Sequence, residues 1–351
     1  MSTIKVSAEH TYEILIDVDW KSELTRLLVG RTRAALIVSE EMQSRVTELN
    51  VGDTELLTFP VPDGEGGKSS ATLLQVWNWL GAAGYTRNDV VIALGGGATT
   101  DFGGFAAASW LRGIDWIAIP TTVAGMVDAA VGGKTAINSE YGKNLIGAFH
   151  SPISVVIDFT WLETLPDRDY AAGLAEVVKA GFIADETILN LVRGKTLAQI
   201  RADRTTVKEI FTRAIAVKAN VVSQDFKETF AREALNYGHT LGHAIELESK
   251  FSMRHGECVS IGMAFMAQLQ LELGLITKDL AQDHVDILEG LGLPTLYKRA
   301  VWPVLLANMS LDKKARGKSL RFVTITGIGK TDRLENPDEK VLFAAYEKVS
   351  S

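Results

Sequence analysis

The sequence predicts two successive domains, an α/β N-terminal domain and an all-α C-terminal domain. In the first 158 residues, short β-branched runs alternate with stretches of helical periodicity, which is typical of a mostly parallel sheet covered by helices. From residue 169 to about residue 289, Ala- and Leu-rich segments recur at helical spacing with few strand-like runs. These two observations place the domain boundary between residues 160 and 166. We therefore expect domains at residues 1–162 and 163–351.

Six short runs account for the predicted strands of the first domain, at residues 12–18, 34–39, 55–61, 89–97, 116–122 and 154–158. Helical periodicity marks residues 72–84 and 100–113 between them. One further extended run, residues 320–326, precedes a final helix in the second domain. Sheets of this kind bind ligands beyond the carboxyl ends of their strands. We expect the active cleft between the two halves.

Composition restricts the class of protein. A chain of 351 residues with 46% hydrophobic and 23% charged residues can bury a sizeable core, as soluble enzymes do. The net charge of −7 argues against a nucleic-acid partner, and no apolar run reaches transmembrane length. The N-terminus lacks the features of a secretory signal, and the single cysteine, Cys258, excludes an intrachain disulfide. We expect a cytoplasmic protein without a membrane partner.

A triple-glycine turn, Gly95 to Gly97, separates a predicted strand from a predicted helix. Glycine lets the backbone approach a ligand closely, and amides at a helix start can receive a pyrophosphate. The pattern differs from the Rossmann GxGxxG motif, and a tight strand-to-helix turn would use the same residues. Three successive glycines exceed what a turn needs, so we interpret the turn as a phosphate loop and the first domain as nucleotide-binding.

The densest chemistry lies between residues 232 and 263, which contain three of the six histidines. His239 and His243 stand four residues apart and would share one face of a helix, while His255 precedes the next apolar run. Two such histidines need a third ligand for a catalytic divalent metal, usually a carboxylate. Glu176 is the candidate, because a bare carboxylate among apolar residues is costly unless it is paired or metal-bound. The alternative is a solvated histidine-rich helix with a core glutamate.

Several cations occur on glycine-rich or apolar stretches, where they could bind an anionic substrate. Each alone is more often a surface residue whose charge reaches solvent. Together, beside a predicted metal, they favour a pocket for phosphate and carboxylate groups. The residues concerned are Lys134, Lys143, Asn144, Lys179, Lys218 and Arg232.

The sequence resembles the 3-dehydroquinate synthase family over most of its length. The matching segments follow the family's order from about residue 64 to residue 314. They are GEGGKS, LGGGATTD, RGIDWIAIPTTVAGMVDAAVGGKTAIN, GKNLIGAFHSP, LAEVVKAGFI, REALNYGHTLGHAIE, HGECVSIGM and LDKK. The resemblance implies an NAD-binding α/β domain and a helical metal-binding domain. It also implies the conversion of 3-deoxy-D-arabino-heptulosonate 7-phosphate into 3-dehydroquinate and phosphate, a step of the shikimate pathway.

The resemblance also implies particular residues for each role. One zinc or cobalt ion would be held by Glu176, His239 and His255, so that His243 would face substrate. NAD would be contacted by Glu40, Glu65, Lys68, Gly96, Gly97, Ala98, Asp101, Thr121, Thr122, Asp128, Lys134, Lys143 and Thr164. Substrate would be contacted by Arg112, Asp128, Lys134, Asn144, Lys179, Lys218, Arg232, Asn236, His243 and either Lys313 or Lys314. Catalytic roles would fall to Lys134, Asn144, Lys179, Asn236 and His243, in a homodimer whose Arg112 reaches the partner subunit's site.

Three other functions compete with this one. Another sugar phosphate cyclase would share the motifs, although Arg232 and Asn236 before GHT, together with GGKTAIN, resemble the family that takes the carboxylated heptulosonate. An iron-type polyol dehydrogenase would share the two-domain plan and the His-rich metal helices, but its uncharged substrate needs no lysines. An inactive binding homologue would lack ligands, and none of the proposed ligands is missing.

Overall fold

The computed structural model describes residues 2–46, 49–227, 231–316 and 320–351, with the backbone alone at residues 231 and 311–316. The chain forms two compact units. The first comprises Met1–Leu165 with Lys218–Lys227, and the second comprises Pro166–Val217 with Glu228–Ser351. Each unit has its own architecture. Among the described residues, none of the helices combines the length and apolarity that a bilayer crossing requires.

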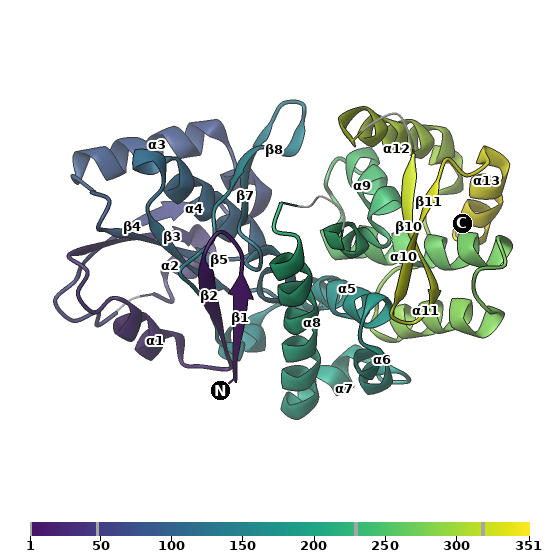
Figure 1. Ribbon diagram of the computed structural model, residues 1–351, viewed down its shortest axis with the longest axis horizontal. Helices are drawn as coiled ribbons and strands as arrows, with labels where there is room; N and C mark the ends of the chain where they lie inside the picture. The colour runs from purple at the N-terminus through teal and green to yellow at the C-terminus, as the bar shows by residue number, and fades with distance from the viewer. Residues whose placement is uncertain (1, 47–48, 228–230, 317–319) are drawn as a thin grey trace. The chain divides into compact units, whose positions relative to one another are not determined.

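The first unit is built on a seven-stranded sheet with the strand order β1-β2-β9-β6-β5-β3-β4 (Figure 1). Only β1 runs antiparallel to its neighbour; the other strands are parallel. The expected strands are confirmed, and β1 is an addition that the sequence did not predict. The strands are β1 (Ser2–Ser7), β2 (Thr11–Ile16), β3 (Arg33–Ser39), β4 (Glu55–Val61), β5 (Val90–Gly95), β6 (Asp115–Pro120) and β9 (Ser154–Ile157).

Helices and short turns join these strands. The strands β5 and β9 are buried along their whole length, as expected for strands covered on both faces. The helices are α1 (Trp20–Leu27), α2 (Glu40–Gln43), α3 (Ser70–Ala82) and α4 (Gly97–Ser109), with shorter turns η1 (Gly64–Gly67), η2 (Trp110–Arg112), η3 (Gly125–Ala129) and η4 (Phe159–Thr164). A separate antiparallel hairpin follows η3 and consists of β7 (Lys134–Ser139) and β8 (Gly142–Phe149).

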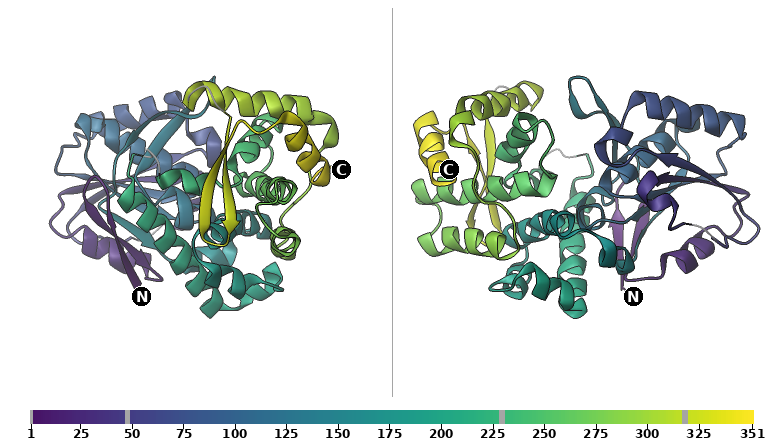
Figure 2. Two further views of the ribbon diagram at one scale, coloured as in Figure 1. Left: turned by 45° about the vertical axis from the view of Figure 1, so that its right-hand side comes forward. Right: turned by 180° about the vertical axis from the view of Figure 1, so that it is seen from behind.

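The second unit is mainly helical (Figure 2). Its elements are α5 (Asp167–Ile183), α6 (Glu186–Val192), α7 (Leu197–Ala202), η5 (Ala231–Asn236), α9 (His239–Glu248), α10 (His255–Glu272), α11 (Lys278–Gly290), η6 (Arg299–Val301), α12 (Trp302–Arg316), β10 (Arg321–Gly327), β11 (Lys330–Glu335) and α13 (Glu339–Lys348). The long helix α8 (Arg204–Gln224) belongs to this unit up to residue 217.

Two helices, α5 and α10, form the core of the second unit. Nearly all residues of both are buried, so neither has the polar face of a surface helix. Helix α10 contacts α5, α9, α11 and α13. The expectation of a helical domain is confirmed, although it is not wholly α because β10 pairs with β11 in an antiparallel hairpin. The largely exposed, polar sequence of β11 explains why only residues 320–326 were predicted to be extended.

Candidate active site

The triple-glycine turn lies where β5 ends and α4 begins, beside the end of the neighbouring strand β6. A Cβ atom on Gly97 would lie 2.9 Å from the Cβ of Ala129, and one on Gly96 would lie 3.3 Å from Cγ2 of Thr122. The Thr121 amide donates a hydrogen bond of 2.8 Å to the Gly95 carbonyl. The glycines therefore allow two strand-end loops to approach closely, and the 13-residue helix α4 starts with its free amides there.

A polar cluster joins residues predicted for the cofactor with Asn144, which was predicted for substrate. Lys68 is almost fully buried, and its Nζ donates to Asp101 Oδ2 at 2.8 Å and to Asn144 Oδ1. Glu65 accepts a hydrogen bond from Asn138 at 2.8 Å and lies 3.6 Å from Lys143 Nζ. Burial raises the pKa of Asp101, and the charge of Lys68 opposes this effect. Asn138 is a member of the cluster that sequence reasoning missed.

Asp128 and Lys218, predicted for substrate or cofactor, are also brought together. The Lys218 ammonium donates to both the carbonyl and the carboxylate of Asp128. Asp128 lies in η3, a π-helical turn, and such turns are frequent at functional sites. The aliphatic part of Lys218 is buried, so the pair holds this part of α8 to the first unit.

The remaining predicted residues of the first unit are more exposed. Glu40 begins α2 directly after β3 ends, and Lys134 is the first residue of β7. Thr164 accepts a hydrogen bond from Arg45. Arg112 is exposed on η2 with a positive φ of 70°, and Leu111 beside it also has a positive φ of 49°. Two consecutive non-glycine residues in the left-handed region are uncommon, and both of these residues are exposed.

Glu176, His239 and His255 meet within the second unit, on α5, α9 and α10 respectively. The Oε1 atom of Glu176 lies 3.6 Å from His239 Nε2 and 3.3 Å from His255 Nε2. One ligand atom from each residue lies within 4.8 Å of the others. Glu176 is 3% exposed, and its Oε1 has no hydrogen-bond partner among the described residues. Buried polar atoms are rarely left without a partner, so this oxygen fits a cation ligand.

The second ring nitrogen of each histidine is engaged by another group. His239 Nδ1 lies 3.1 Å from the Tyr237 carbonyl oxygen, to which it can only donate. His255 Nδ1 lies 3.3 Å from Glu246 Oε1. When Nδ1 carries the proton, Nε2 presents its lone pair, as metal-bound histidines do. Glu246 was missed, although it lies three residues after His243 and seven after His239, on the same helical face.

Electrostatics keep this cluster charged. Burial alone would raise the pKa of Glu176, but the charge of Lys179 and the contact with His255 hold it well below its ordinary value. Burial and the Lys179 charge lower the pKa of His239, so this ring is neutral. Burial opposes protonation of His255 as well, yet contacts with Glu176 and Glu246 raise its pKa to about 10. Without an ion, the cluster therefore holds one ionised carboxylate, one neutral imidazole and one imidazolium.

The other predicted residues of the second unit lie on the same helices or next to them. Lys179 is buried one helical turn after Glu176 and pairs with Glu176 Oε2. The ring of His243 lies 5.3 Å from that of His239 and 6.0 Å from that of His255, measured between centroids. Arg232 is buried and Asn236 half-buried on η5, the turn that precedes α9. The side chains of Lys313 and Lys314 lie outside the described part.

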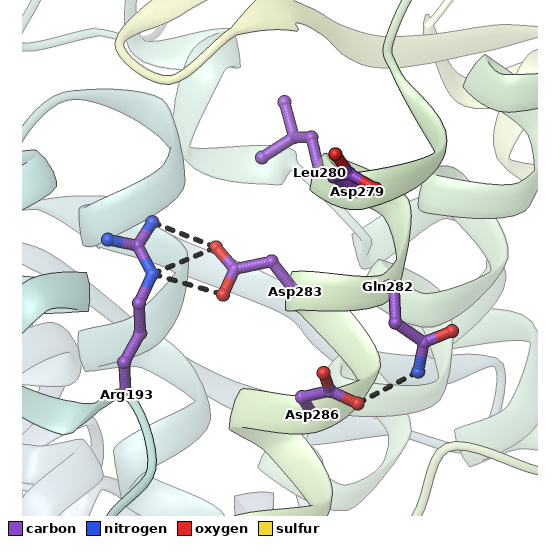
Figure 3. A pocket seen from close by; sticks show the side chains of 6 residues that line it. All are labelled: Arg193, Asp279, Leu280, Gln282, Asp283 and Asp286. Carbon is purple, nitrogen blue, oxygen red and sulfur yellow. Dashed lines mark hydrogen bonds and ion pairs between the residues drawn. The ribbon is translucent and has the colours of Figure 1, made fainter.

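A pocket elsewhere in the second unit contains none of the predicted site residues. It has a volume of about 520 Å³ and is lined mainly by α11 (Figure 3). Arg193 closes one side through hydrogen bonds of 2.8 to 3.1 Å to Asp283. Its other lining residues are Asp279, Leu280, Gln282 and Asp286. The polar side chains that line this pocket are an ion pair and other acidic or amide groups of one helix face, and they do not form a catalytic or metal-binding arrangement.

The sequence matches two models of one protein family and a similar protein of the same name. Residues 58–172 match the model of the 3-dehydroquinate synthase N-terminal domain, and residues 173–315 match that of the C-terminal domain. The 3-dehydroquinate synthase of Pseudarthrobacter chlorophenolicus is 47% identical over an alignment of 351 positions, which covers 98% of this chain and 96% of the relative.

Solved structures share the fold at lower identity. The 2-epi-5-epi-valiolone synthase of Streptomyces hygroscopicus subsp. jinggangensis, solved with NAD+ and Zn2+, superposes with a TM-score of 0.89 at 24% identity, over 99% of this chain and 98% of that one. A 2-deoxy-scyllo-inosose synthase, solved with carbaglucose-6-phosphate, NAD+ and Co2+, gives 0.85 at 22% identity, over 99% and 100%. From the two family models and the extent of the sequence identity, the chain belongs to the 3-dehydroquinate synthase family.

Proposed function

We propose that the chain converts 3-deoxy-D-arabino-heptulosonate 7-phosphate into 3-dehydroquinate and phosphate, with NAD that is regenerated in each turnover and one divalent ion. Membership of the family supports the reaction. The observation that carries the metal is the buried Glu176 Oε1, which faces two imidazole nitrogens and has no hydrogen-bond partner among the described residues. The known structures with NAD and zinc or cobalt support the choice of cofactors.

Glu176, His239 and His255 would hold the ion. One carboxylate and two imidazoles are a ligand set that catalytic zinc sites use, with a further position left for substrate. Zinc or cobalt suits this mixture of nitrogen and oxygen donors. The carboxylate is already ionised and His239 is already neutral, so two of the three ligands need no change of protonation.

NAD would be held by the loops at the ends of β3, β5 and β6. The turn of Gly96 and Gly97 at the start of α4 would receive the pyrophosphate, and Glu40 after β3 would contact the adenosine ribose. The polar cluster around Lys68 would contact the rest of the cofactor. When bound, NAD supplies a reversible hydride acceptor for C5 of the substrate, and the ion supplies a Lewis acid for its C4 and C5 oxygens.

The chain's own cations would orient the anionic substrate. We assign the binding of its carboxylate and phosphate to basic and amide groups, because fixed charges aimed at an anion position it and stabilise developing charge. His243, Lys134 and Asn144 would position the leaving phosphate, which takes the proton from the neighbouring carbon as its own C–O bond breaks. The other proposed contacts are Arg112, Asp128, Lys179, Lys218, Arg232, Asn236 and one of Lys313 and Lys314.

We also propose a homodimer in the cytoplasm, with Arg112 contributed to the partner subunit's site. The turn at Leu111 and Arg112 supports this assignment, because both side chains are exposed and both residues have a positive φ. An Arg held out on a strained turn has no evident role within its own unit.

The reaction distinguishes this proposal from its rivals. Protein loaded with Zn2+ or Co2+ is mixed with NAD and a panel of sugar phosphates, and phosphate and NADH are followed together. We expect phosphate release from the heptulosonate phosphate without accumulation of NADH. Phosphate release from another sugar phosphate alone would identify a different cyclase, and NADH formation from an uncharged polyol would identify a dehydrogenase.

A further inference from the structure

We propose that Glu246 is a positioning residue for the metal site, whose carboxylate accepts the Nδ1 proton of His255 and so turns Nε2 of that ring toward Glu176. The inference rests on the proposed function, because it assumes that Glu176, His239 and His255 share an ion. It concerns the orientation of one ligand, and it gives Glu246 a role through His255 that is not a contact with substrate.

The position of Glu246 on α9 makes this contact possible. His239, His243 and Glu246 follow one another at intervals of four and three residues, so all three lie on one face of the helix. Glu246 is 6% exposed, and its Oε1 lies 3.3 Å from His255 Nδ1. A buried carboxylate needs polar partners, and the imidazole of His255 is one. The contact therefore joins the end of α9 to the beginning of α10.

The two nitrogens of His255 face two different carboxylates. Nδ1 lies 3.3 Å from Glu246 Oε1, and Nε2 lies 3.3 Å from Glu176 Oε1. A neutral imidazole carries one proton, so the carboxylate that accepts it decides which nitrogen keeps the lone pair. Glu176 already pairs with Lys179 through Oε2. When Nδ1–H is directed to Glu246, the lone pair of Nε2 points to the position shared with Glu176.

The backbone at His255 is fixed by other contacts, which leaves the ring as the adjustable part. Glu257 accepts a hydrogen bond from the Arg254 amide at 2.9 Å and pairs with Arg168 on α5 at 2.5 and 2.8 Å. A Cβ on Gly256 would lie only 1.7 Å from the Ala172 carbonyl oxygen, so the main chains of α5 and α10 touch there. Glu246 therefore acts on the rotation of the His255 ring about its side-chain bonds.

His239 offers a contrast within the same site. Its Nδ1 faces the Tyr237 carbonyl, a main-chain group that a substitution cannot remove. The orientation of His255 depends instead on a side chain, so it can be tested separately. A second grouping, His243, Glu246 and His255, could also share an ion. The orphaned oxygen of Glu176 favours the first grouping, in which Glu246 is not a ligand.

The test measures the affinity of the full-length protein for Zn2+ by competition with a chromophoric chelator, together with the visible absorption of the Co2+ form. The variants are Glu246→Leu, which removes the acceptor, and Glu246→Gln, which keeps a neutral acceptor oxygen. Glu248→Gln on the same helix is the matched control, because Glu248 bonds to Tyr297 and Lys298 and not to His255. Glu176→Gln tests the metal site itself.

We expect Glu246→Leu to weaken Zn2+ binding between about 10- and 100-fold, the usual effect of removing a group that orients a ligand. Glu246→Gln should lose less Zn2+ affinity than Glu246→Leu. The Co2+ absorption spectrum should change in both Glu246 variants but not in Glu248→Gln. Thermal unfolding of the metal-free variants measures any general loss of stability. Such a loss alone would not alter the Co2+ spectrum of the folded protein, so a changed spectrum reports on the metal site.

Three outcomes would overturn the inference. In the first, Glu246→Leu keeps the Zn2+ affinity and Co2+ absorption of the wild type while Glu176→Gln loses binding. The proposed metal site would then stand, but Glu246 would have no part in orienting His255. In the second, both Glu246 variants lose Zn2+ binding completely while Glu176→Gln retains it. Glu246 would then be a ligand in the grouping of His243, Glu246 and His255. Unchanged binding in Glu176→Gln and in Glu246→Leu would refute the proposed metal site together with this inference.

Discussion

Nε2 of His255 lies 3.3 Å from Oε1 of Glu176, an oxygen that accepts no hydrogen bond from the described residues. A proton on that nitrogen and a divalent ion at the same place exclude each other. Glu176 and Glu246 raise the pKa of His255 to about 10 against the opposing effect of burial, so the metal-free ring is protonated at pH 7 to 8. Ion binding must therefore displace a proton.

This displacement predicts that Zn2+ binds more tightly as the pH rises. Since a ligand must lose its proton before it binds, affinity should increase about tenfold per pH unit below the His255 pKa. Calorimetric titration of the metal-free protein at pH 7.5, in two buffers with different ionisation enthalpies, should show close to one proton released per ion. Release of no proton, with a pH-independent affinity, would contradict the protonation of His255.

Arg112 gives a prediction about the dimer. If Arg112 of each subunit serves the partner's site, mixing inactive Arg112→Ala with inactive His239→Ala should restore activity after subunit exchange. Random pairing makes half of the dimers mixed, and one of the two sites in each is complete, so about one quarter of wild-type activity should return.

The control for this experiment is a mixture of His239→Ala and Glu176→Gln, in which every site of the mixed dimer keeps one damaged ligand. That mixture should stay inactive. If the Arg112→Ala mixture also stays inactive after exchange has been verified by mass, Arg112 acts within its own subunit or in neither site.

The ion pair of Lys68 and Asp101 predicts a strong effect on stability. Lys68 is 1% exposed and the Asp101 side chain 18% exposed, so Lys68→Met leaves a largely buried carboxylate without its cation. Breaking a buried pair in this way costs roughly 3 kcal/mol. Thermal unfolding should show a clear loss of stability for Lys68→Met. The double variant Lys68→Met with Asp101→Asn should recover part of that stability.

Lys143→Met is the matched control, because its partner Glu65 is 3.6 Å away and substantially exposed. Such a pair contributes less than about 1 kcal/mol, so the unfolding midpoint should change little. Equal losses of stability in Lys68→Met and Lys143→Met would mean that burial of the Lys68–Asp101 pair does not add to its contribution to stability.

His284 predicts how stability depends on pH. It is fully buried, its ring stacks on Phe182 at 3.6 Å, and Tyr237 OH lies 2.9 Å from its Nε2. Burial lowers its pKa to about 4 from an ordinary 6.5. Between these pH values the unfolded chain binds the proton and the folded chain does not, so stability falls as the pH drops from 6.5 to 4. The total loss is roughly 3 kcal/mol.

Urea unfolding at several pH values measures this slope. His284→Gln should be less stable than the wild type at pH 8, because the stacked ring is lost, but its stability should fall less steeply between pH 6.5 and 4. A slope in His284→Gln equal to that of the wild type would assign the acid sensitivity to other groups.

The sequence predicted those parts of the fold that repeat a simple pattern. β-branched runs bounded by Gly, Pro or Thr identified six strands of the main sheet, and Ala-rich stretches identified the helical unit. Among the strands of the described residues, β1, the β7–β8 hairpin and β11 escaped. Their residues are largely exposed or mixed in polarity, and their pairing depends on neighbours rather than on an apolar period.

The site was predictable where chemistry restricts the residue type. A lone carboxylate among apolar residues identified Glu176, and spacing identified the cluster of three histidines. The choice of His239 and His255 over His243 came from the family resemblance. Glu246 could have been found from its spacing to His239, but a glutamate near the end of a helix is ordinarily solvated. The Tyr237 carbonyl could not be found at all, because every residue has such a group and only the turn before α9 aims it at an imidazole.

Main-chain contacts join the three helices that carry the proposed metal ligands. Besides Gly256 against Ala172, a Cβ on Gly262 would lie 1.9 Å from the Gly238 carbonyl oxygen, and one on Gly242 would lie 3.2 Å from the Cys258 carbonyl oxygen. Helices that touch through their backbones have little freedom to slide. The spacing of Glu176, His239 and His255 is thus set by the packing of the polypeptide itself. Protein from which the metal has been removed by a chelator should therefore bind added metal again without first unfolding.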